Sequence, residues 1–349
     1  MSGGLRSWIL ACMTNSTTPD TGAKRFWRHT GLLAGLGAII AFGLGAAYLS
    51  IGHDPQPRDL PIAVVGPPAA AEALEAEAPD ELSARAVPDL AAAREAIGER
   101  DVYGAVVPGP EGAREVLIAS AASNQVANFL RRTAGQATPE NVPEVVDAAP
   151  LPEDDSGGSS IPLLVTVLIL GGSVGVVGMA KVLPRFEARP SQGVLPLTFL
   201  LVYALVFGLG LTAISAVFGV GTDAAVIDRV LALSLISLAV TASTAALIAL
   251  IGPAGSAVTS LLYFVLGGQI NGGSTAPEFL PPFWKELGEH LPGGAGVSLL
   301  RDVFYFPEAS TGRPLAVLGV YAAGGLLVLL ALHLVHARRR VHVPVPTAA

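Results

Sequence analysis

The sequence predicts an α-helical integral membrane protein with six transmembrane helices and a small extracellular α/β domain between helices 1 and 2. Three observations support this fold class. Only 14% of the 349 residues are charged, whereas about 25% of an average soluble domain is charged. Two long stretches, 190–222 and the 48-residue run 230–277, contain no charged side chain. Residues 52–160 carry 19 acidic and 7 basic side chains, a net charge of −12, which indicates a domain in water.

Six apolar segments have, or approach, the roughly 20 residues that cross a bilayer. They are 31–51, 161–183, 315–336 and three within 194–271, namely 196–218, 230–251 and the shorter 255–271. We divide the uncharged run at Gly252-Pro253-Ala254-Gly255, because proline lacks an amide donor and glycine permits a tight reversal. The competing interpretation, one very long helix, would far exceed the hydrocarbon thickness.

Basic residues near the ends of the spans predict the orientation. They form three clusters: Lys24, Arg25 and Arg28; Lys181, Arg185 and Arg189; and Arg338, Arg339 and Arg340. We expect the protein in the plasma membrane. Six spans then place all three clusters in the cytoplasm, together with the tails 1–28 and 337–349 and the loop 184–193. The segments 52–160, 219–229 and 272–314 are then extracellular. A cleaved signal peptide is the alternative interpretation of the first span, and Met13 is an alternative start.

Within the acidic segment, apolar runs bounded by proline and glycine alternate with helical patterns. We expect strands at 61–66, 82–88, 102–108 and 115–121, and helices at 69–78, 90–100 and 123–135. Asp89 and Ser123 are the expected caps of the last two helices. This alternation predicts a small α/β domain. Residues 139–160, rich in Pro, Gly, Ser and acids, are interpreted as a linker back to the membrane.

The segment 272–314 mixes aromatic residues with isolated charges. Prolines and glycines break it into two short amphipathic helices, with Phe279, Phe283, Trp284 and Leu287 expected on one face of the first. Such helices suit the membrane interface. We expect two interfacial or re-entrant helices that cap the outer mouth of the bundle, and the alternative is a plain amphipathic loop packed on it.

The sequence lacks the motifs of common enzymes. It contains no GxxxxGK[ST] loop, no GxSxG elbow and no HExxH pair, and its single cysteine, Cys12, excludes an intrachain disulfide. His333, His336 and His342 are interpreted as residues of a helix end, not as metal ligands. We therefore predict no catalytic residue, no cofactor and no metal, and the charge balance does not favour nucleic acid.

The order of segments gives the chain a resemblance to a known family. One span, an external α/β domain and five further spans, with a broken amphipathic segment before the last, resemble ABC-2-type transporter permeases, especially the phage-infection-protein-like (YhgE/Pip) group. Leu280-Pro281, Phe283-Trp284, Leu291-Pro292 and Leu300-Arg301-Asp302 carry the local similarity, as do PIAVVG (61–66) and VYGAVVP (102–108). The resemblance implies a homodimeric exporter in the lipid bilayer, driven by a separate ATP-binding-cassette ATPase subunit.

Two sets of residues are candidates for such a function. The cytoplasmic loop, with Arg185, Glu187 and Arg189, is the candidate ATPase contact, although it has a single acid and no Gly-Thr pair, so the coupling stays open. The candidate pathway or outer gate comprises Gln269, Asn271, Trp284 and Arg301. Arg301 has a structural alternative, an ion pair with Asp302 or Glu308.

We therefore expect a permease that moves an amphiphilic or cell-envelope substrate outward. The alternative is a non-transporting membrane scaffold or receptor, which would bind a cell-envelope partner through the external domain.

Overall fold

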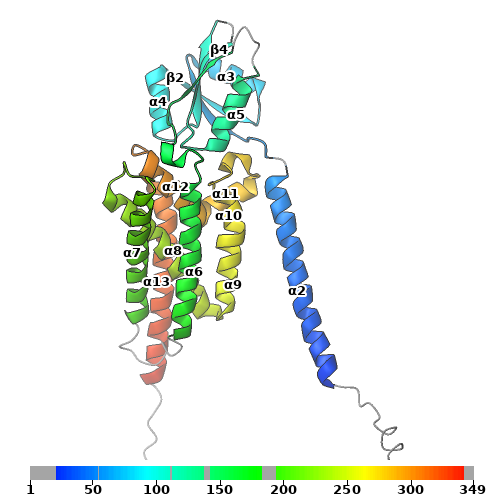
Figure 1. Cartoon of the computed structure of the whole chain (residues 1–349). Coiled ribbons are helices and arrows are strands. Elements are labelled where there is room, and N and C mark those ends of the chain that lie inside the picture. The colour runs from blue at the N-terminus through cyan, green and yellow to red at the C-terminus, as the bar shows by residue number, and fades with distance from the viewer. Residues whose placement is uncertain (1–20, 54, 111, 137–141, 183–193, 342–349) are drawn as a thin grey trace, which may run out of the picture. The chain divides into compact units, whose positions relative to one another are not determined.

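A computed structural model describes residues 21–53, 55–110, 112–136, 142–182 and 194–341 (Figure 1). The chain divides into two units, residues 1–53 and 54–349. The described part of the first unit contains the helix α2 (Thr21–Gly52). Its stretch Phe26–Gly52 is long and apolar enough to cross a membrane, and it covers the first predicted span.

The second unit begins with a five-stranded mixed sheet in the order β2-β1-β3-β4-β5. The strands are β1 (Leu60–Val65), β2 (Leu82–Val87), β3 (Gly104–Gly109), β4 (Gly112–Ile118) and β5 (Glu144–Asp147). β1 lies between β2 and β3 and is parallel to both, β4 is antiparallel to β3, and β5 is parallel to β4. We call this sheet and its three helices the sheet domain.

The three helices of the sheet domain cover both faces of the sheet. They are α3 (Pro68–Glu77), α4 (Leu90–Gly98) and α5 (Asn124–Ala134). Asp89 accepts a hydrogen bond from the Ala92 amide, and Ser123 accepts one from the Val126 amide, so both predicted caps are confirmed. α4 and α5 contribute to separate apolar clusters on opposite faces, because successive side chains of a strand point to opposite sides. The predicted small α/β arrangement is confirmed.

The linker prediction for 139–160 is wrong for the part that the structure describes, residues 142–160. This part contains β5 and the 3₁₀ turn η1 (Glu153–Asp155). The buried Asp155 accepts hydrogen bonds from the amides of Ser159 and Ser160, where the next helix begins. The four residues of β5 show no strand periodicity in the sequence. The strand therefore depends on its pairing with β4 and not on a local pattern.

Four long apolar helices follow: α6 (Ser160–Val182), α7 (Val194–Val217), α8 (Val226–Ile251) and α13 (Gly312–Val341). With α2, the described residues therefore contain five helices long and apolar enough to span a membrane. We call α6, α7, α8 and α13 the bundle. α8 is its central helix: half of its most apolar window is buried, against 17–28% in the other three. The chain is thus mostly helical, as a helical membrane protein requires.

The fifth predicted span is a shorter, irregular helix. α8 ends at Ile251, and Gly252 adopts a φ of +72° at the predicted reversal, so the division of the uncharged run is confirmed. The chain continues through α9 (Ala254–Thr259), the π-helical turns η3 (Ser260–Leu266) and α10 (Gly267–Ile270). Seventeen helical residues rise only about 25 Å, less than the roughly 30 Å hydrocarbon core. A sixth span therefore stays a prediction.

The segment before α13 forms the two short helices that the prolines predicted. It contains the 3₁₀ turn η4 (Pro277–Phe279), α11 (Pro282–His290) and α12 (Pro292–Tyr305). The predicted apolar face is partly wrong, because Phe279 is buried in η4 whereas Phe283 is 67% exposed on α11. α12 is not a surface helix either: most of its residues are buried, and it packs against α6, α8 and α13.

A close approach of α13 to α8 gives a first stability prediction. A Cβ on Gly325 would lie 2.6 Å from the Ala242 carbonyl oxygen of α8, whereas one on the adjacent Gly324 would meet nothing. We expect Gly325→Ala to force the two helices apart and to destabilise the protein by about 1–3 kcal/mol. Thermal unfolding in detergent would measure the loss. Gly324→Ala is the matched control, and an equal loss in this variant would contradict the packing argument.

Candidate functional site

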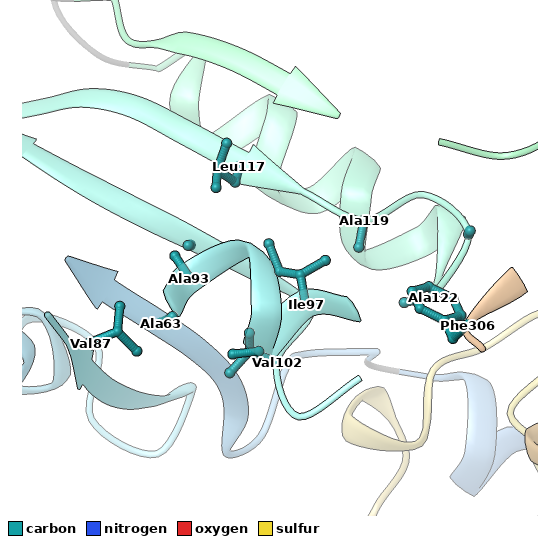
Figure 2. Close-up of a cluster of buried hydrophobic side chains, with 12 residues drawn as sticks. Ala63, Val87, Ala93, Ile97, Val102, Leu117, Ala119, Ala122 and Phe306 are labelled. Carbon is teal, nitrogen blue, oxygen red and sulfur yellow. The ribbon is translucent and has the colours of Figure 1, made fainter. Parts of the chain in front are cut away.

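The sheet domain and the bundle meet at an interface built by the residues just before α11 and just after α12. Phe279, before α11, is 4% exposed and belongs to the apolar cluster beneath α5, where it meets Phe129 edge to face at 5.7 Å. Phe306, directly after α12, is 2% exposed and belongs to the opposite cluster beneath α4. Figure 2 shows its ring beside Ala122. Each face of the sheet is therefore closed by residues from outside the domain's own sequence, Phe279 with the neighbouring Ala276 on the α5 side and Phe306 on the α4 side.

A buried ion pair joins the same two parts. Arg100, in the corner between α4 and β3, forms an ion pair with Asp302 of α12, and both side chains are largely buried. The guanidinium also donates to the Ser298 carbonyl at 3.3 Å and lies 5.6 Å from the centre of the Phe306 ring. Arg100 has a φ of +60°, an unfavourable conformation for a residue with a long side chain. The surrounding contacts must hold it there.

Arg301, the neighbour of Asp302, is buried and points to the turn after α10. It donates to the carbonyl oxygens of Gly272 at 2.7 Å and Gly273 at 2.9 Å. Burial lowers the pKa of its guanidinium to about 10, and the nearby charge of Arg100 acts in the same direction. The proposed pairing of Arg301 with Asp302 or Glu308 is wrong, because Asp302 pairs with Arg100 and the Arg301 bonds go to main-chain carbonyls.

A cavity of about 260 Å³ lies at this interface, and we call it the junction cavity. The corner after α4, the turn after α10, η4, α12 and the start of α13 all contribute to its wall. Its polar lining residues are Arg100, Tyr103, Asn271, Glu278, Glu289, Ser298, Arg301 and Arg313. A concave site with convergent charged groups is the usual form of a ligand site. The junction cavity is therefore the candidate functional site.

Two tyrosines at the junction are held in the neutral form. Burial raises the pKa of Tyr103 well above 10, and the neighbouring Glu278 carboxylate adds to the effect. Burial also raises the pKa of Tyr305, whose hydroxyl donates to Asp155 at 3.0 Å. Burial disfavours the charged form of each phenol.

The raised pKa of Tyr103 predicts a loss of stability in base. The folded-state pKa lies above the unfolded value of 10, so this contribution is complete below pH 10 and is lost as the pH rises, by up to about 1.4 kcal/mol per pH unit. The lowered pKa of Arg301 acts with the opposite sign between about 10 and 12.5. The comparison of wild type with Tyr103→Phe isolates the phenol. We expect a shallower decline for the variant in thermal unfolding above pH 10, and parallel curves would contradict the assignment.

The structure brings two of the predicted gate residues together. Asn271 and Arg301 both line the junction cavity, and the Asn271 carboxamide oxygen accepts a hydrogen bond from the Gly273 amide. Gln269 is exposed on α10 and Trp284 is half-buried on α11 against Phe283, and neither lines this cavity. The predicted ATPase-contact residues Arg185, Glu187 and Arg189 lie outside the described residues.

Sequence reasoning missed the partners that the sheet domain and η4 supply. Arg100 and Tyr103 lie about 200 residues from Asp302 and Arg301 along the chain. Glu278 comes from η4, a third part of the chain. A helix-to-strand corner with a lone arginine has no distinctive spacing. The one available signal is the Leu300-Arg301-Asp302 triplet, in which two opposite charges stand inside an otherwise apolar helical pattern.

Two further hollows adjoin the sheet domain. One, of about 290 Å³, lies on another side of Arg301 and is lined by amide and hydroxyl side chains that include Asn124, Asn128 and Ser274. The other, of about 510 Å³, is an apolar groove on the sheet face between α3 and α5, with Phe129 and Val106 in its wall. Among the described residues, no group of three or more His, Cys, Asp or Glu side chains could hold a metal ion.

The comparisons add no relative to this picture. No family model, no curated protein and no solved structure matches the chain.

Proposed function

We propose that the chain is the membrane permease of an ABC-2-like exporter, which moves an amphiphilic or cell-envelope substrate outward. It works as a homodimer, and a separate ATP-binding-cassette ATPase supplies the energy through the loop 184–193. The observation that carries the proposal is the junction cavity, where a polar site lies between the sheet domain and the ends of apolar helices.

The way in which the two parts are joined supports transport over simple tethering. A receptor domain on a flexible linker would close its own core, whereas this sheet domain depends on Phe279 and Phe306 beside α11 and α12. α12 in turn packs against α6, α8 and α13. Any displacement of α12 in the bundle would therefore be transmitted to the sheet domain and to the cavity between them.

The proposed six-span topology can be tested by cysteine labelling. Cys12 is the single cysteine, so Cys12→Ser provides a cysteine-free background. Into it we would introduce Glu99→Cys, Asp223→Cys and Ala254→Cys, all at exposed positions. Six spans predict that a membrane-impermeant thiol reagent labels the first two in intact cells, and the third only after permeabilisation. Labelling of Ala254→Cys in intact cells would overturn the predicted orientation of the fourth span.

Export itself can be measured with inverted membrane vesicles. We expect vesicles that contain the protein to accumulate a fluorescent amphiphile when ATP is supplied, and the triple variant Arg185→Ala, Glu187→Ala, Arg189→Ala to lose this dependence. Purification in mild detergent should recover an ATPase with wild type and not with the triple variant. Accumulation that is equal in vesicles without the protein would overturn the export function.

The apolar groove of the sheet domain favours the second candidate, a receptor that binds a cell-envelope partner. Deletion of the domain cannot discriminate cleanly, because it would leave Phe279 and Phe306 exposed. A polar substitution in the groove is sharper: Leu74→Gln is expected to abolish binding by a receptor and to leave export by a permease close to wild type. Leu74 lines the groove on α3 and does not line the junction cavity.

A further inference from the structure

The hollow of about 290 Å³ beside Arg301 has no carboxylate among the described residues that line it, and we call it the polar hollow. The starts of α5 and α6, the turn after α10 and the helix α12 all contribute to its wall. Its polar side chains are amides and hydroxyls, such as Asn124, Asn128 and Ser274, together with the guanidinium of Arg301. The junction cavity, in contrast, has two glutamates in its wall. The polar hollow therefore combines one positive charge with neutral hydrogen-bonding groups.

Arg301 supplies this charge. The residue is 7% exposed, and among the described residues no carboxylate lies within the 4.0 Å that defines an ion pair with it. Although burial lowers the pKa of its guanidinium to about 10, the group is positively charged at neutral pH. A buried charge without a counter-ion is costly. An anion in the polar hollow would therefore stabilise Arg301.

Three of the five N–H groups of Arg301 remain for such an anion. Nη1 donates to the Gly272 carbonyl and Nη2 to the Gly273 carbonyl, so each of these nitrogens keeps one further hydrogen. Nε takes part in neither bond. Among the described residues, the enclosed side-chain nitrogens without a partner all belong to Arg229, so Nε of Arg301 keeps accessible surface. A guanidinium with free N–H groups is the side chain best suited to bind phosphate oxygens.

The start of α5 adds backbone donors. Asn124 and Gln125 are the first two residues of this 11-residue helix, and both line the polar hollow. The cap Ser123 accepts from the Val126 amide, and in the described part of the chain nothing accepts from the amides of Asn124 and Gln125. The first amides of a helix carry the positive end of its dipole and bind phosphate in many proteins.

One carboxylate lies near the polar hollow without lining it. Asp155 accepts from the amides of Ser159 and Ser160 at the start of α6, and from the hydroxyl of Tyr305. These bonds within the chain occupy Asp155 and satisfy the start of α6. The donors that are left for a ligand are those of Arg301 and of α5.

We propose that the polar hollow binds a phosphate group, whose oxygens accept from the three remaining N–H groups of Arg301 and from the first amides of α5. Several donors from two elements suit the tetrahedral oxygens of phosphate better than the planar pair of a carboxylate. The binding site is independent of the proposed export, and it deepens that function only where the phosphate belongs to the exported amphiphile.

The size of the hollow limits the ligand. A water molecule takes about 30 Å³ in the liquid, so 290 Å³ corresponds to roughly ten water-sized groups. Glycerol 3-phosphate falls within this limit, whereas the acyl chains of a phospholipid would have to stay outside. The phosphate can come from a lipid headgroup or from a free phosphate ester, and the experiment must separate these two sources.

Binding can be measured on the full-length protein in a maltoside detergent, which contains no phosphate. Isothermal titration with inorganic phosphate and glycerol 3-phosphate tests the free source, with glycerol as the probe that lacks the phosphate. Native mass spectrometry of protein from liposomes that contain equal amounts of phosphatidylglycerol and diacylglycerol tests the lipid source. We expect the phosphate-bearing member of at least one pair to bind about tenfold or more tightly, because a hydrogen bond to a charged group contributes at least that factor.

Asn124→Asp is the decisive variant. It keeps the size of the side chain, and an acid in the first turn of a helix does not disfavour the helix. The new carboxylate in the wall should weaken phosphate binding about tenfold or more, because like charges a few ångströms apart near a protein surface repel by at least that factor. Gln136→Glu is the matched control: it makes the same change of charge in the sheet domain but does not line the polar hollow, so its affinity should stay close to wild type.

Arg301→Gln removes the charge itself and should abolish binding. Because Arg301 also holds the turn after α10 through Gly272 and Gly273, thermal unfolding must show that this variant is folded. If it is not, Asn124→Asp decides alone.

Each result decides the proposal. Binding of free phosphate or glycerol 3-phosphate that Asn124→Asp weakens supports it with a soluble source, and retention of phosphatidylglycerol that the variant loses supports it with a membrane source. No binding in either arm, equal binding by wild type and Asn124→Asp, or an equal loss in Gln136→Glu would overturn it. Because none of these measurements requires transport, phosphate binding without export would overturn the permease alone, and export without phosphate binding would overturn the site alone.

Discussion

Replacement of Arg100 by asparagine should lower the free energy of unfolding by about 3–5 kcal/mol, the usual loss when one partner of a buried ion pair is removed. The substitution leaves Asp302 buried without its cation, and it removes the contact with Phe306. Asparagine is the appropriate replacement because it tolerates a positive φ, so the backbone conformation at +60° is not an added cost. Thermal unfolding in detergent, with amide hydrogen exchange at β1 and β3, would measure the loss.

The matched control is the exposed ion pair of the same domain. Arg85 lies 3.1 Å from Asp101, with the two side chains 61% and 50% exposed. Solvent screens such a pair, so Arg85→Asn should cost less than about 1 kcal/mol. Losses of equal size at Arg85 and Arg100 would contradict the role assigned to the junction.

A double-mutant cycle would separate the pair from its surroundings. Asp302→Asn leaves Arg100 without its carboxylate, and the double variant leaves no buried charge of the pair unbalanced. We therefore expect the sum of the stability losses of the two single variants to exceed the stability loss of the double variant. Additive losses would show that Arg100 and Asp302 contribute independently, through their other neighbours.

Local features of the fold were predictable from the sequence because they depend on neighbours along the chain. The capping residues Asp89 and Ser123, the reversal at Gly252 and the breaks around α11 each follow from the chemistry of a few adjacent residues. The long apolar helices follow in the same way from composition and length. Orientation in the membrane stays a prediction from the basic clusters.

The candidate site was predictable only in part, because its residues meet through long-range packing. Asn271 and Arg301 were identifiable as polar residues in an apolar context, but Arg100 and Tyr103, which line the same cavity, come from a domain some 170–200 residues earlier. The strand β5 was not predicted, for a related reason: its four residues form a strand because they pair with β4. No periodicity of the sequence indicates such a pairing, and none indicates that Glu278 and Arg301 line the same cavity.

Phe306→Ala should destabilise the sheet domain by about 3–5 kcal/mol, as is usual when a fully buried phenylalanine is truncated. Phe306 is 2% exposed and belongs to the buried cluster that contains residues of β1, β3 and α4, although it follows α12 and lies far from them in sequence. We expect faster hydrogen exchange in β1, β3 and α4 and a lower unfolding temperature, because the cavity left by the ring opens the domain core on the α4 side (Figure 2).

Phe283→Ala is the control for this substitution, since its ring is 67% exposed on α11 and its loss should cost less than about 1 kcal/mol. The pair also tests how far the sheet domain is a separate folding unit. If Phe306→Ala leaves exchange in β1 and β3 unchanged, the domain closes its own core and could move as a tethered module. If exchange rises there while Phe283→Ala has no effect, the domain is stable only when α12 is in place, and a rearrangement of the bundle around α12 must reach the cavity that contains Arg301 and Glu278.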